Sequence, residues 1–247
     1  MATVPTGRME RELRKLFLRW LAGLPDQQDI PAYVALFEQQ SRDLVARLGG
    51  YAASLGAVAD FPAPKRLELS PVAGVVYSQM EQAAIQAGMM VGLASTDTAR
   101  RMLNAGVGQG FNRLMRLART ETVSAYWQNT WDSVRDLPGI VLVWSSESGP
   151  RTCEWCLGRD GLVVESGSIR DHPNGRCTLA PVARSKVRYR GTLQPDGSVT
   201  FDPRWGGDGR TVIPVVGGKA RAAAPGALPA VPVQTSREEG FTEMSLA

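Results

Sequence analysis

Apolar residues recur every three or four positions through the first half of the chain, with charged residues between them. In the first such stretch, Leu13, Phe17 and Trp20 keep this spacing, while Arg14 and Lys15 fall between them. A stripe of this kind is typical of amphipathic helices, which bury their apolar sides against one another. The pattern predicts long helices at residues 7–23, 32–48, 70–93 and 111–134.

Glycine and proline mark the expected helix ends. Pro25 ends the first helix, and Gly49-Gly50 is expected to terminate the second, since glycine adopts the left-handed backbone found after helices. Pro71 is expected at the first helical position of the third helix. Thr96 favours the start of a further helix, which the sequence GVGQG at residues 106–110 is expected to interrupt. A phosphate-binding loop would need a strand before those glycines, so we interpret them as a break between helices.

The pattern changes after residue 138. Residues 140–144, IVLVW, are apolar and largely β-branched, which indicates a buried strand, and residues 162–164 form a second candidate strand. Residues 184–189 alternate charged and apolar side chains. The turn sequence at residues 194–197 would join them to a return strand at residues 199–201.

These elements predict an α+β fold with three parts. Residues 1–138 form a helical docking and assembly domain, and residues 139–216 form a small β module that carries the cysteines and the histidine. Residues 217–247, rich in alanine, proline, glycine and polar residues, are expected to form a flexible tail or one ordered only by a partner.

Composition supports a folded core, and the sequence argues against a membrane-spanning protein and against a secreted one. Of the 247 residues, 43% are hydrophobic, and the formal net charge of +4 is not by itself the signature of a nucleic-acid-binding protein. No apolar run approaches the ~20 residues needed to cross a bilayer, and the N-terminal residues lack the apolar segment of a signal peptide. We therefore expect a protein kept in a reducing cytoplasm, with no membrane contact.

All three cysteines and the only histidine lie within one short stretch. They are Cys153, Cys156, His172 and Cys177, with the spacing Cys-x2-Cys, 15 residues, His-x4-Cys. Zinc prefers four tetrahedral ligands, and three thiolates with one imidazole complete that set. The stretch therefore predicts a structural Zn²⁺ site, whose binding free energy would contribute to folding of the module.

Two other interpretations of these residues stay open. Two of the cysteines could form a disulfide or a redox pair, although three cysteines leave one over and a reducing compartment disfavours the bond. The cysteines could also remain unligated as small buried hydrophobic residues, with His172 on the surface. A catalytic zinc is disfavoured, because four protein ligands leave no position for water.

A basic segment after the cluster is a second candidate site. Residues 182–221 hold eight Lys and Arg against three Asp, an excess of five. On the predicted strand, one face would carry Arg184, Lys186, Arg188 and Arg190. Such a face is usually solvated, but it could also contact nucleic acid or an acidic partner.

Nothing in the sequence forms a recognisable catalytic set. A nucleophilic cysteine needs a base, and His172 is the only imidazole; as a metal ligand it could not act as one. Asp160, Glu165 and Asp171 lie near the cluster, but the sequence does not establish a paired-carboxylate geometry. We therefore expect a non-enzymatic protein with no small-molecule substrate.

Several short motifs follow one another in a specific order: Arg-Thr-Glu on a helix, a strand ending in Trp, Arg-Thr-Cys-x2-Cys, Asp-Gly and His-Pro-x2-Arg-Cys. They are carried by Arg119, Thr120, Glu121, Trp144, Arg151, Thr152, Cys153, Cys156, Asp160, Gly161, His172, Pro173, Arg176 and Cys177. This order resembles the phage head-morphogenesis family, the Mu F-like minor capsid proteins. The resemblance covers about residues 95–182.

The resemblance implies a minor head protein of a tailed phage or prophage, present in few copies beside the portal and the inner capsid. Such proteins act in head assembly and sometimes handle the DNA that enters. The expected partners are the portal protein and the major capsid protein, with DNA as a further candidate. The expected location is the virion, assembled in the host cytoplasm. A zinc-stabilised nucleic-acid-binding module is the alternative.

Two positions depart from the family pattern. The family often has a cysteine two residues before the last one, where this chain has Gly175, so four candidate ligands remain with no surplus. An acidic residue often stands two positions before the Arg of the Arg-Thr-Cys run, where this chain has Gly149. This chain therefore has no carboxylate at that position.

Overall fold

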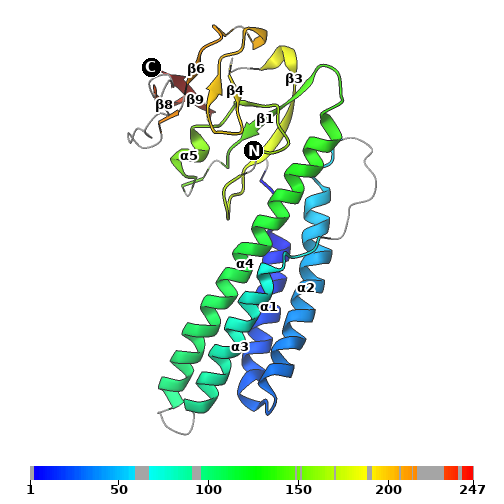
Figure 1. The fold of residues 1–247 in the computed structure, drawn as a ribbon, viewed down its shortest axis with the longest axis vertical. Helices are drawn as coiled ribbons and strands as arrows, with labels where there is room; N and C mark the ends of the chain where they lie inside the picture. Colours follow the sequence, from blue (N-terminus) through cyan, green and yellow to red (C-terminus); the bar gives the residue numbers. More distant parts are fainter. Residues whose placement is uncertain are drawn as a thin grey trace.

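The protein consists of an elongated helical bundle with a small β module at one end (Figure 1). The computed structural model describes residues 3–58, 67–90, 96–147, 149–150, 152–169, 171–187, 191–205, 207–212, 214–215, 231–238 and 241–246. This arrangement of helices followed by a sheet confirms the predicted α+β class.

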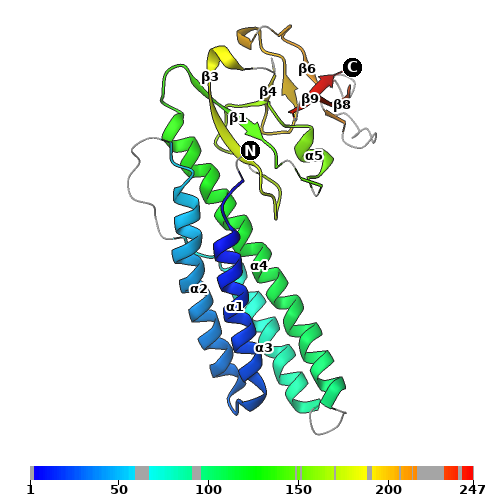
Figure 2. The ribbon, with the colours of Figure 1, turned by 180° about the vertical axis from the view of Figure 1, so that it is seen from behind.

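Four helices build the bundle. They are α1 (Gly7–Gly23), α2 (Ile30–Ser54), α3 (Val72–Met90) and α4 (Thr96–Val134), with a short 3-10 helix, η1 (Leu24–Asp26), after α1. The apolar stripes that the sequence predicts meet in the bundle core, where Phe17 of α1 stacks on Phe111 of α4 with ring centroids 4.0 Å apart. Seen from behind, α1 lies between α2 and α4 (Figure 2).

The pair Gly49-Gly50 does not end α2, so this sequence-based prediction is wrong. The helix continues to Ser54. A Cβ on Gly49 would lie 2.7 Å from Leu67 Cδ2 and 2.9 Å from Thr122 Oγ1. Glycine is therefore required here by close packing against α4 and the segment before α3, and not by the geometry of a helix cap.

The predicted break at residues 106–110 is also wrong, since α4 passes through them without interruption. A Cβ on Gly110 would overlap Met80 Cγ, and one on Gly106 would lie 2.8 Å from Ala83 Cβ. Both glycines face α3, and they allow the two helices to approach more closely than larger residues would permit.

The β module is built on one mixed sheet. Its strands are β1 (Ile140–Ser145), β2 (Val163–Val164), β3 (Thr178–Ala183), β4 (Thr192–Leu193), β5 (Val199–Thr200) and β6 (Thr211–Val212), in the order β3-β1-β2-β4-β5-β6. The central strand β1 pairs antiparallel with both β2 and β3, whereas β2 pairs parallel with β4. A single helical turn, α5 (Glu154–Leu157), lies between β1 and β2, and a 3-10 turn, η3 (Pro203–Trp205), lies between β5 and β6.

The described part of the basic segment, residues 184–187, does not form the predicted strand. Arg184 and Lys186 lie in a 3-10 turn, η2 (Arg184–Lys186), directly after β3. Because successive side chains of a 3-10 helix are about 120° apart, these two do not share a face. Arg188 and Arg190 lie outside the described residues. The predicted hairpin turn does exist, but it joins β4 to β5, with Gly197 at a φ of +85°.

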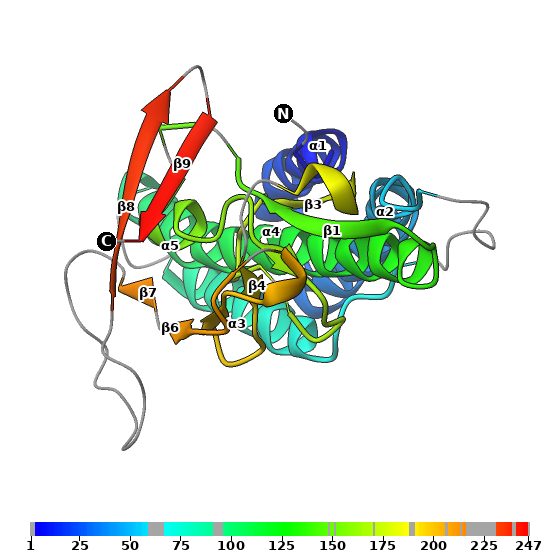
Figure 3. The same ribbon diagram turned by 90° about the horizontal axis from the view of Figure 1, so that it is seen from above.

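A second sheet contains the last strands of the chain. It has the order β7-β8-β9, formed by β7 (Pro214–Val215), β8 (Val231–Glu238) and β9 (Phe241–Leu246). Seen from above, β8 and β9 lie to one side of the bundle end (Figure 3). Both strands fall within the range for which composition predicts a flexible tail, whereas residues 217–230 lie outside the described residues.

The C-terminal half of α4 belongs to the core of the β module. Trp127 of α4 is 1% exposed and meets Trp144 of β1 edge to face, with ring centroids 4.7 Å apart. Val123 and Val134 of α4 pack into the same core. The expected boundary at residue 138 therefore follows a helix that carries side chains of two cores, one in the bundle and one in the module.

Within the described residues, no helix combines the length and apolar character that crossing a membrane requires.

Candidate metal centre

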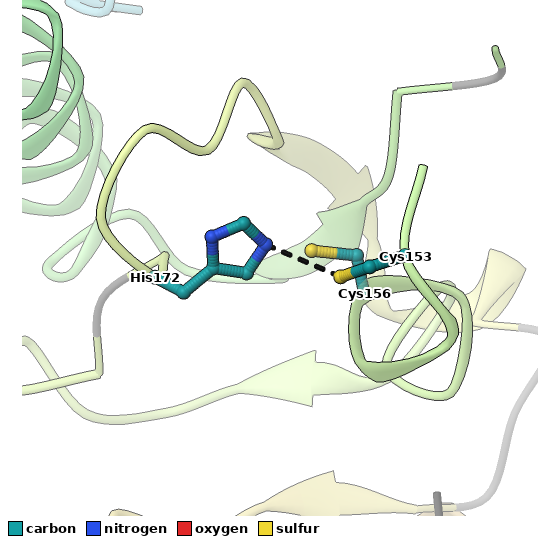
Figure 4. A group of neighbouring side chains, drawn as sticks. All are labelled: Cys153, Cys156 and His172. Atoms are coloured by element: carbon teal, nitrogen blue, oxygen red, sulfur yellow. Dashed lines mark hydrogen bonds between the residues drawn. The ribbon is translucent and has the colours of Figure 1, made fainter. Parts of the chain in front are cut away.

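Two loops of the module carry the predicted ligands. The first loop leads from β1 into α5, with Cys153 immediately before this turn and Cys156 within it. The carbonyl of Cys153 accepts hydrogen bonds from the backbone N–H groups of Cys156 and Leu157, each at 3.0 Å. The Cys-x2-Cys spacing thus forms one helical turn, which directs both sulfurs toward the same side (Figure 4).

The second loop leads into β3 and carries His172 and Cys177. The backbone N–H of Gly175 donates to the carbonyl of His172 at 2.9 Å, which closes a tight turn. Asn174 in this turn has a φ of 66°, in the left-handed region that asparagine tolerates better than most residues. The turn places the His172 ring opposite α5.

The two loops bring three predicted ligands together. Cys153 Sγ lies 3.2 Å from His172 Nε2 (Figure 4). The ligand atoms of Cys153, Cys156 and His172 all lie within 4.8 Å of one another. Thiolate and imidazole at these separations are a typical donor set for a transition metal, so the group could hold a metal ion.

The fourth predicted ligand, Cys177, lies in a second group that overlaps the first. Cys156, Asp171 and Cys177 also have ligand atoms within 4.8 Å of one another, so Cys156 is common to both groups. All four predicted ligands line the same cavity, which has a volume of about 130 Å³. The spacing in the sequence therefore identified residues that the fold does gather, although Cys177 is not part of the first group.

Asp171 is a candidate ligand that sequence reasoning did not assign. Its side chain is 1% exposed, and its two oxygens accept the backbone N–H groups of His172 at 2.8 Å and Cys177 at 2.9 Å. One of these oxygens also lies 3.6 Å from Cys156 Sγ. A buried carboxylate is costly unless a positive charge compensates it, and a metal ion in this cluster would provide that charge.

Gly175 makes room for this carboxylate. A Cβ at this position would overlap Oδ2 and Cγ of Asp171. A side chain here would displace Asp171, so the cysteine that the family pattern often has at this place is incompatible with the present geometry. Here, a buried carboxylate occupies the space beside the cluster.

Hydrogen bonds within the cluster shift the pKa values of its members. Burial alone would raise the pKa of Cys153, but hydrogen bonds with Cys156 and His172 hold it below its ordinary value. The hydrogen bond with Cys177, together with burial, raises the pKa of Cys156. Burial opposes charge on His172, yet the Pro173 carbonyl, Asp171 and Cys153 raise its pKa. A divalent cation would favour thiolates and a neutral imidazole throughout.

Asp171→Asn tests whether the buried carboxylate supports metal binding. The substitution keeps the shape of the side chain but removes its charge and one of its two acceptor oxygens. We expect the affinity for metal to fall by roughly 10- to 100-fold, the usual effect of losing a group that orients ligands. Competition with a chromophoric chelator measures this affinity.

Asp160→Asn is the matched control for this change. Asp160 is also a module carboxylate, but it accepts hydrogen bonds from the backbone N–H and the hydroxyl of Ser146, at 2.6 and 2.9 Å. It belongs to neither metal-holding group among the described residues. Equal metal affinity for Asp171→Asn and the parent protein would contradict a role for Asp171 at the metal.

The second loop is also fastened to the bundle, and this gives the Arg-Thr-Glu motif of α4 a structural role. Arg119 forms a two-pronged ion pair with Glu10 of α1, at 2.7 and 2.6 Å, and also donates to the Asn174 side chain. Thr120 Oγ1 accepts the backbone N–H of Asn174 at 3.0 Å. The second loop thus contacts α4 directly, and Arg119 links it to α1.

Replacement of Arg119 by methionine keeps most of the apolar stem and removes this link. The ion pair is largely buried, with side-chain exposures of 12% for Arg119 and 19% for Glu10. We expect unfolding to cost about 1–3 kcal/mol less, because Glu10 loses its charged partner. Chemical denaturation measures the loss, and Arg116→Met, on the exposed side of α4, should change stability by less than about 0.5 kcal/mol.

The stability that Arg119→Met loses should decrease as the pH falls through the pKa of Glu10. Burial alone would raise the pKa of Glu10, but hydrogen bonds from Arg119 and Thr6 hold it below its ordinary value of 4.5. The parent protein therefore gains this stability above pH 4.5 and loses it as the pH falls through the lower folded-state pKa. A difference between parent and variant that persists at still lower pH would contradict this assignment.

The remaining predicted site residues lie elsewhere. Arg184 and Lys186 line neither the cluster nor its cavity, and their predicted contact with nucleic acid or an acidic partner stays a prediction.

Comparison with known proteins adds no assignment: no family model, no curated protein and no solved structure matches the chain.

Proposed function

We propose that this protein is a non-enzymatic minor component of the head of a tailed phage or prophage. In this proposal the helical bundle docks on portal and capsid subunits, and a zinc ion holds the β module in shape. The location would be the virion, at the portal vertex or the inner capsid surface. Direct contact with packaged DNA is a further part of the proposal.

The observation that carries the structural part is the convergence of three thiols, one imidazole and one buried carboxylate from two separate loops. Zinc is the metal that this set favours, because sulfur and nitrogen ligands in Cys3His combinations form tetrahedral structural sites. Cys153, Cys156, His172 and Cys177 would hold the ion, with Asp171 orienting the loop. The bound ion would cross-link α5 to the loop before β3.

The resemblance to minor capsid proteins supports the location. Several residues that carry the resemblance form hydrogen bonds around the cluster. Arg119 and Thr120 bond to Asn174 in the loop that follows His172, and Asp160 accepts the backbone N–H of Ser146 after β1. Gly161 adopts a φ of +82°, which favours glycine. These contacts position the two loops of the cluster, which supports a structural role for the described motif residues.

Metal analysis of the purified protein tests the first part. A closed four-ligand site predicts about one zinc per chain. Zinc well below that ratio, in protein purified without chelators, would contradict the structural-zinc proposal.

The location requires a separate experiment. Mass spectrometry of purified phage particles should detect the protein, and purified portal rings should retain it in a pull-down. Cys156→Ser separates the two parts: it should release zinc, whether or not the bundle still binds the portal. Absence from particles together with no portal binding would rule out the head assignment and leave the metal result standing.

A further inference from the structure

A groove lies between α1 and α2, with a volume of about 480 Å³. Its lining includes three leucines, Leu16, Leu36 and Leu44, together with the rings of Trp20 and Tyr33. Leu36 is 45% exposed, so covering the rest of its apolar surface would contribute favourably to binding. The groove therefore offers an apolar surface that a partner could bury.

The dimensions of the groove suit a helix. Its lining residues on α2 run from Tyr33 to Arg47, spaced three to four positions apart along one face. At 1.5 Å per residue this stripe is about 21 Å long, or roughly four helical turns. A partner helix of similar length could place residues at i, i+3 and i+7 along the leucines, as in other helix-in-groove complexes.

The charges around the groove are predominantly positive. Arg19 lines it from α1 and Arg47 from α2, opposite a single carboxylate, Asp43, which already has an interaction. The rest of α1 adds to this charge, with four further Lys and Arg against two Glu. Both glutamates are engaged within the chain, Glu10 by Arg119 and Glu12 by Lys15.

Arg19 and Arg47 therefore remain for a partner. Both are exposed and line the groove. Neither forms an ion pair with another residue in the part of the chain that the structure describes. Arginine is the cation best suited to bind carboxylates at an interface, because its planar group donates two parallel hydrogen bonds.

We infer that this groove binds an acidic amphipathic helix of a partner protein. Apolar residues of that helix would cover the leucines, and its carboxylates would meet Arg19 and Arg47. Nucleic acid fits less well, because a phosphate backbone has no apolar side chains to cover the groove floor. A second copy of this chain also fits less well, since α2 is neutral by count and α3 carries a single glutamate.

The inference goes beyond the proposed function and does not depend on the metal centre. None of the groove residues lines the cavity of the Cys/His cluster. Finding no zinc in the protein would therefore not contradict the groove inference, and finding no peptide binding at the groove would not contradict the zinc proposal.

Selection from a displayed library of random 18-residue peptides tests the groove even though the partner is unidentified. The target is the full-length protein, and Leu36→Asp serves for counter-selection because this partly exposed residue can change without disturbing the core. We expect enriched peptides to be net acidic, with apolar residues at helical spacing. No enrichment over the Leu36→Asp protein, or enrichment of basic peptides, would overturn the inference.

Affinity measurements on one enriched peptide complete the test. Fluorescence anisotropy should show binding weakened by roughly tenfold or more for Leu36→Asp and for the double change Arg19→Glu with Arg47→Glu. Val75→Asp is the matched control, since Val75 is 59% exposed on α3, and it should bind the peptide as the parent does. Equal loss in the control would overturn the inference.

Two further measurements distinguish the other occupants. A 24-base-pair DNA duplex that binds more tightly than the peptide, and loses binding with the same substitutions, would assign the surface to nucleic acid. Sedimentation showing a dimer that Leu36→Asp dissociates would assign it to a second copy. Either result would overturn the acidic-helix inference.

Discussion

Cys156→Ser is expected to have the largest effect of any single substitution in this protein. Cys156 is 2% exposed and is the one cysteine shared by both groups that could hold a metal ion. Its loss removes a ligand from whichever set binds the ion and leaves a polar hydroxyl in a buried position. We expect zinc binding to be lost, with the β module destabilised by about 5 kcal/mol or more.

The physical reason is the small size of the β module. Apart from β1 and β3, its strands in the six-stranded sheet are two residues long, so few ladder hydrogen bonds hold each of them. The ion would cross-link two loops that are 15 residues apart in sequence, and its binding free energy would contribute directly to folding. Removal of the ion with a chelator should therefore reproduce the effect of the substitution.

Near-ultraviolet circular dichroism and hydrogen exchange measure the outcome. Trp144 and Trp155 lie in the module and contact one another, so their signal should change before the helical signal of the bundle does. Returning zinc should restore the parent protein after chelation, but not the variant. Identical melting of the parent, the chelated parent and Cys156→Ser would refute a folding role for the metal.

Because α4 contributes side chains to both cores, the destabilisation should extend from the β module into the C-terminal part of this helix. The sequence alone predicts that ligand substitutions spare all of the N-terminal helices. The residues of α4 after Val123 pack in the module core, so exchange should also increase there. The half of α4 that packs against Phe17 and Met80 in the bundle core should stay protected.

Trp127→Ala should have the second largest effect. Trp127 is 1% exposed, packs against Trp144, and donates its indole N–H to the carbonyl of Cys177 at 2.9 Å. Truncation would leave a large cavity where α4 meets the sheet, and would leave that carbonyl without this donor. Substitutions of this kind cost about 3–5 kcal/mol.

Trp127→Phe separates the packing contribution from the hydrogen bond. The phenyl ring keeps much of the apolar area but cannot donate to Cys177, so we expect a loss nearer to 1–2 kcal/mol. Leu137→Ala, at a position 40% exposed, should change stability by less than about 0.5 kcal/mol. Urea denaturation of the three variants measures these differences, and equal losses for the alanine and phenylalanine variants would contradict the packing argument.

Trp127→Ala should also weaken metal binding, because the Cys177 backbone would lose its anchor on α4. A chelator competition assay measures this weakening. Unchanged affinity in the destabilised variant would show that β3 positions Cys177 without help from α4.

The sequence by itself determined the parts that depend on neighbouring residues. Helical periodicity located α1, α2, α3 and the part of α4 after residue 110, because residues three or four positions apart share a face whatever lies beyond the helix. The concentration of every cysteine and the only histidine in residues 153–177 indicated a cluster that could hold a metal ion, since no cysteine or histidine lies elsewhere in the chain. The apolar run at residues 140–144 likewise identified β1.

Only the tertiary structure decided what depends on residues far apart in the chain. In the sequence, Gly49 and Gly110 resemble residues that end helices. In the fold, Leu67 packs too closely on Gly49, and Met80 too closely on Gly110, for either position to carry a Cβ. Asp171 is one of 24 acidic residues, and its burial beside the cluster follows from the folded loop. Arg119 meets its partner Glu10 across 109 positions. Such contacts form only when folding brings distant segments together, so short-range spacing in the sequence cannot specify them.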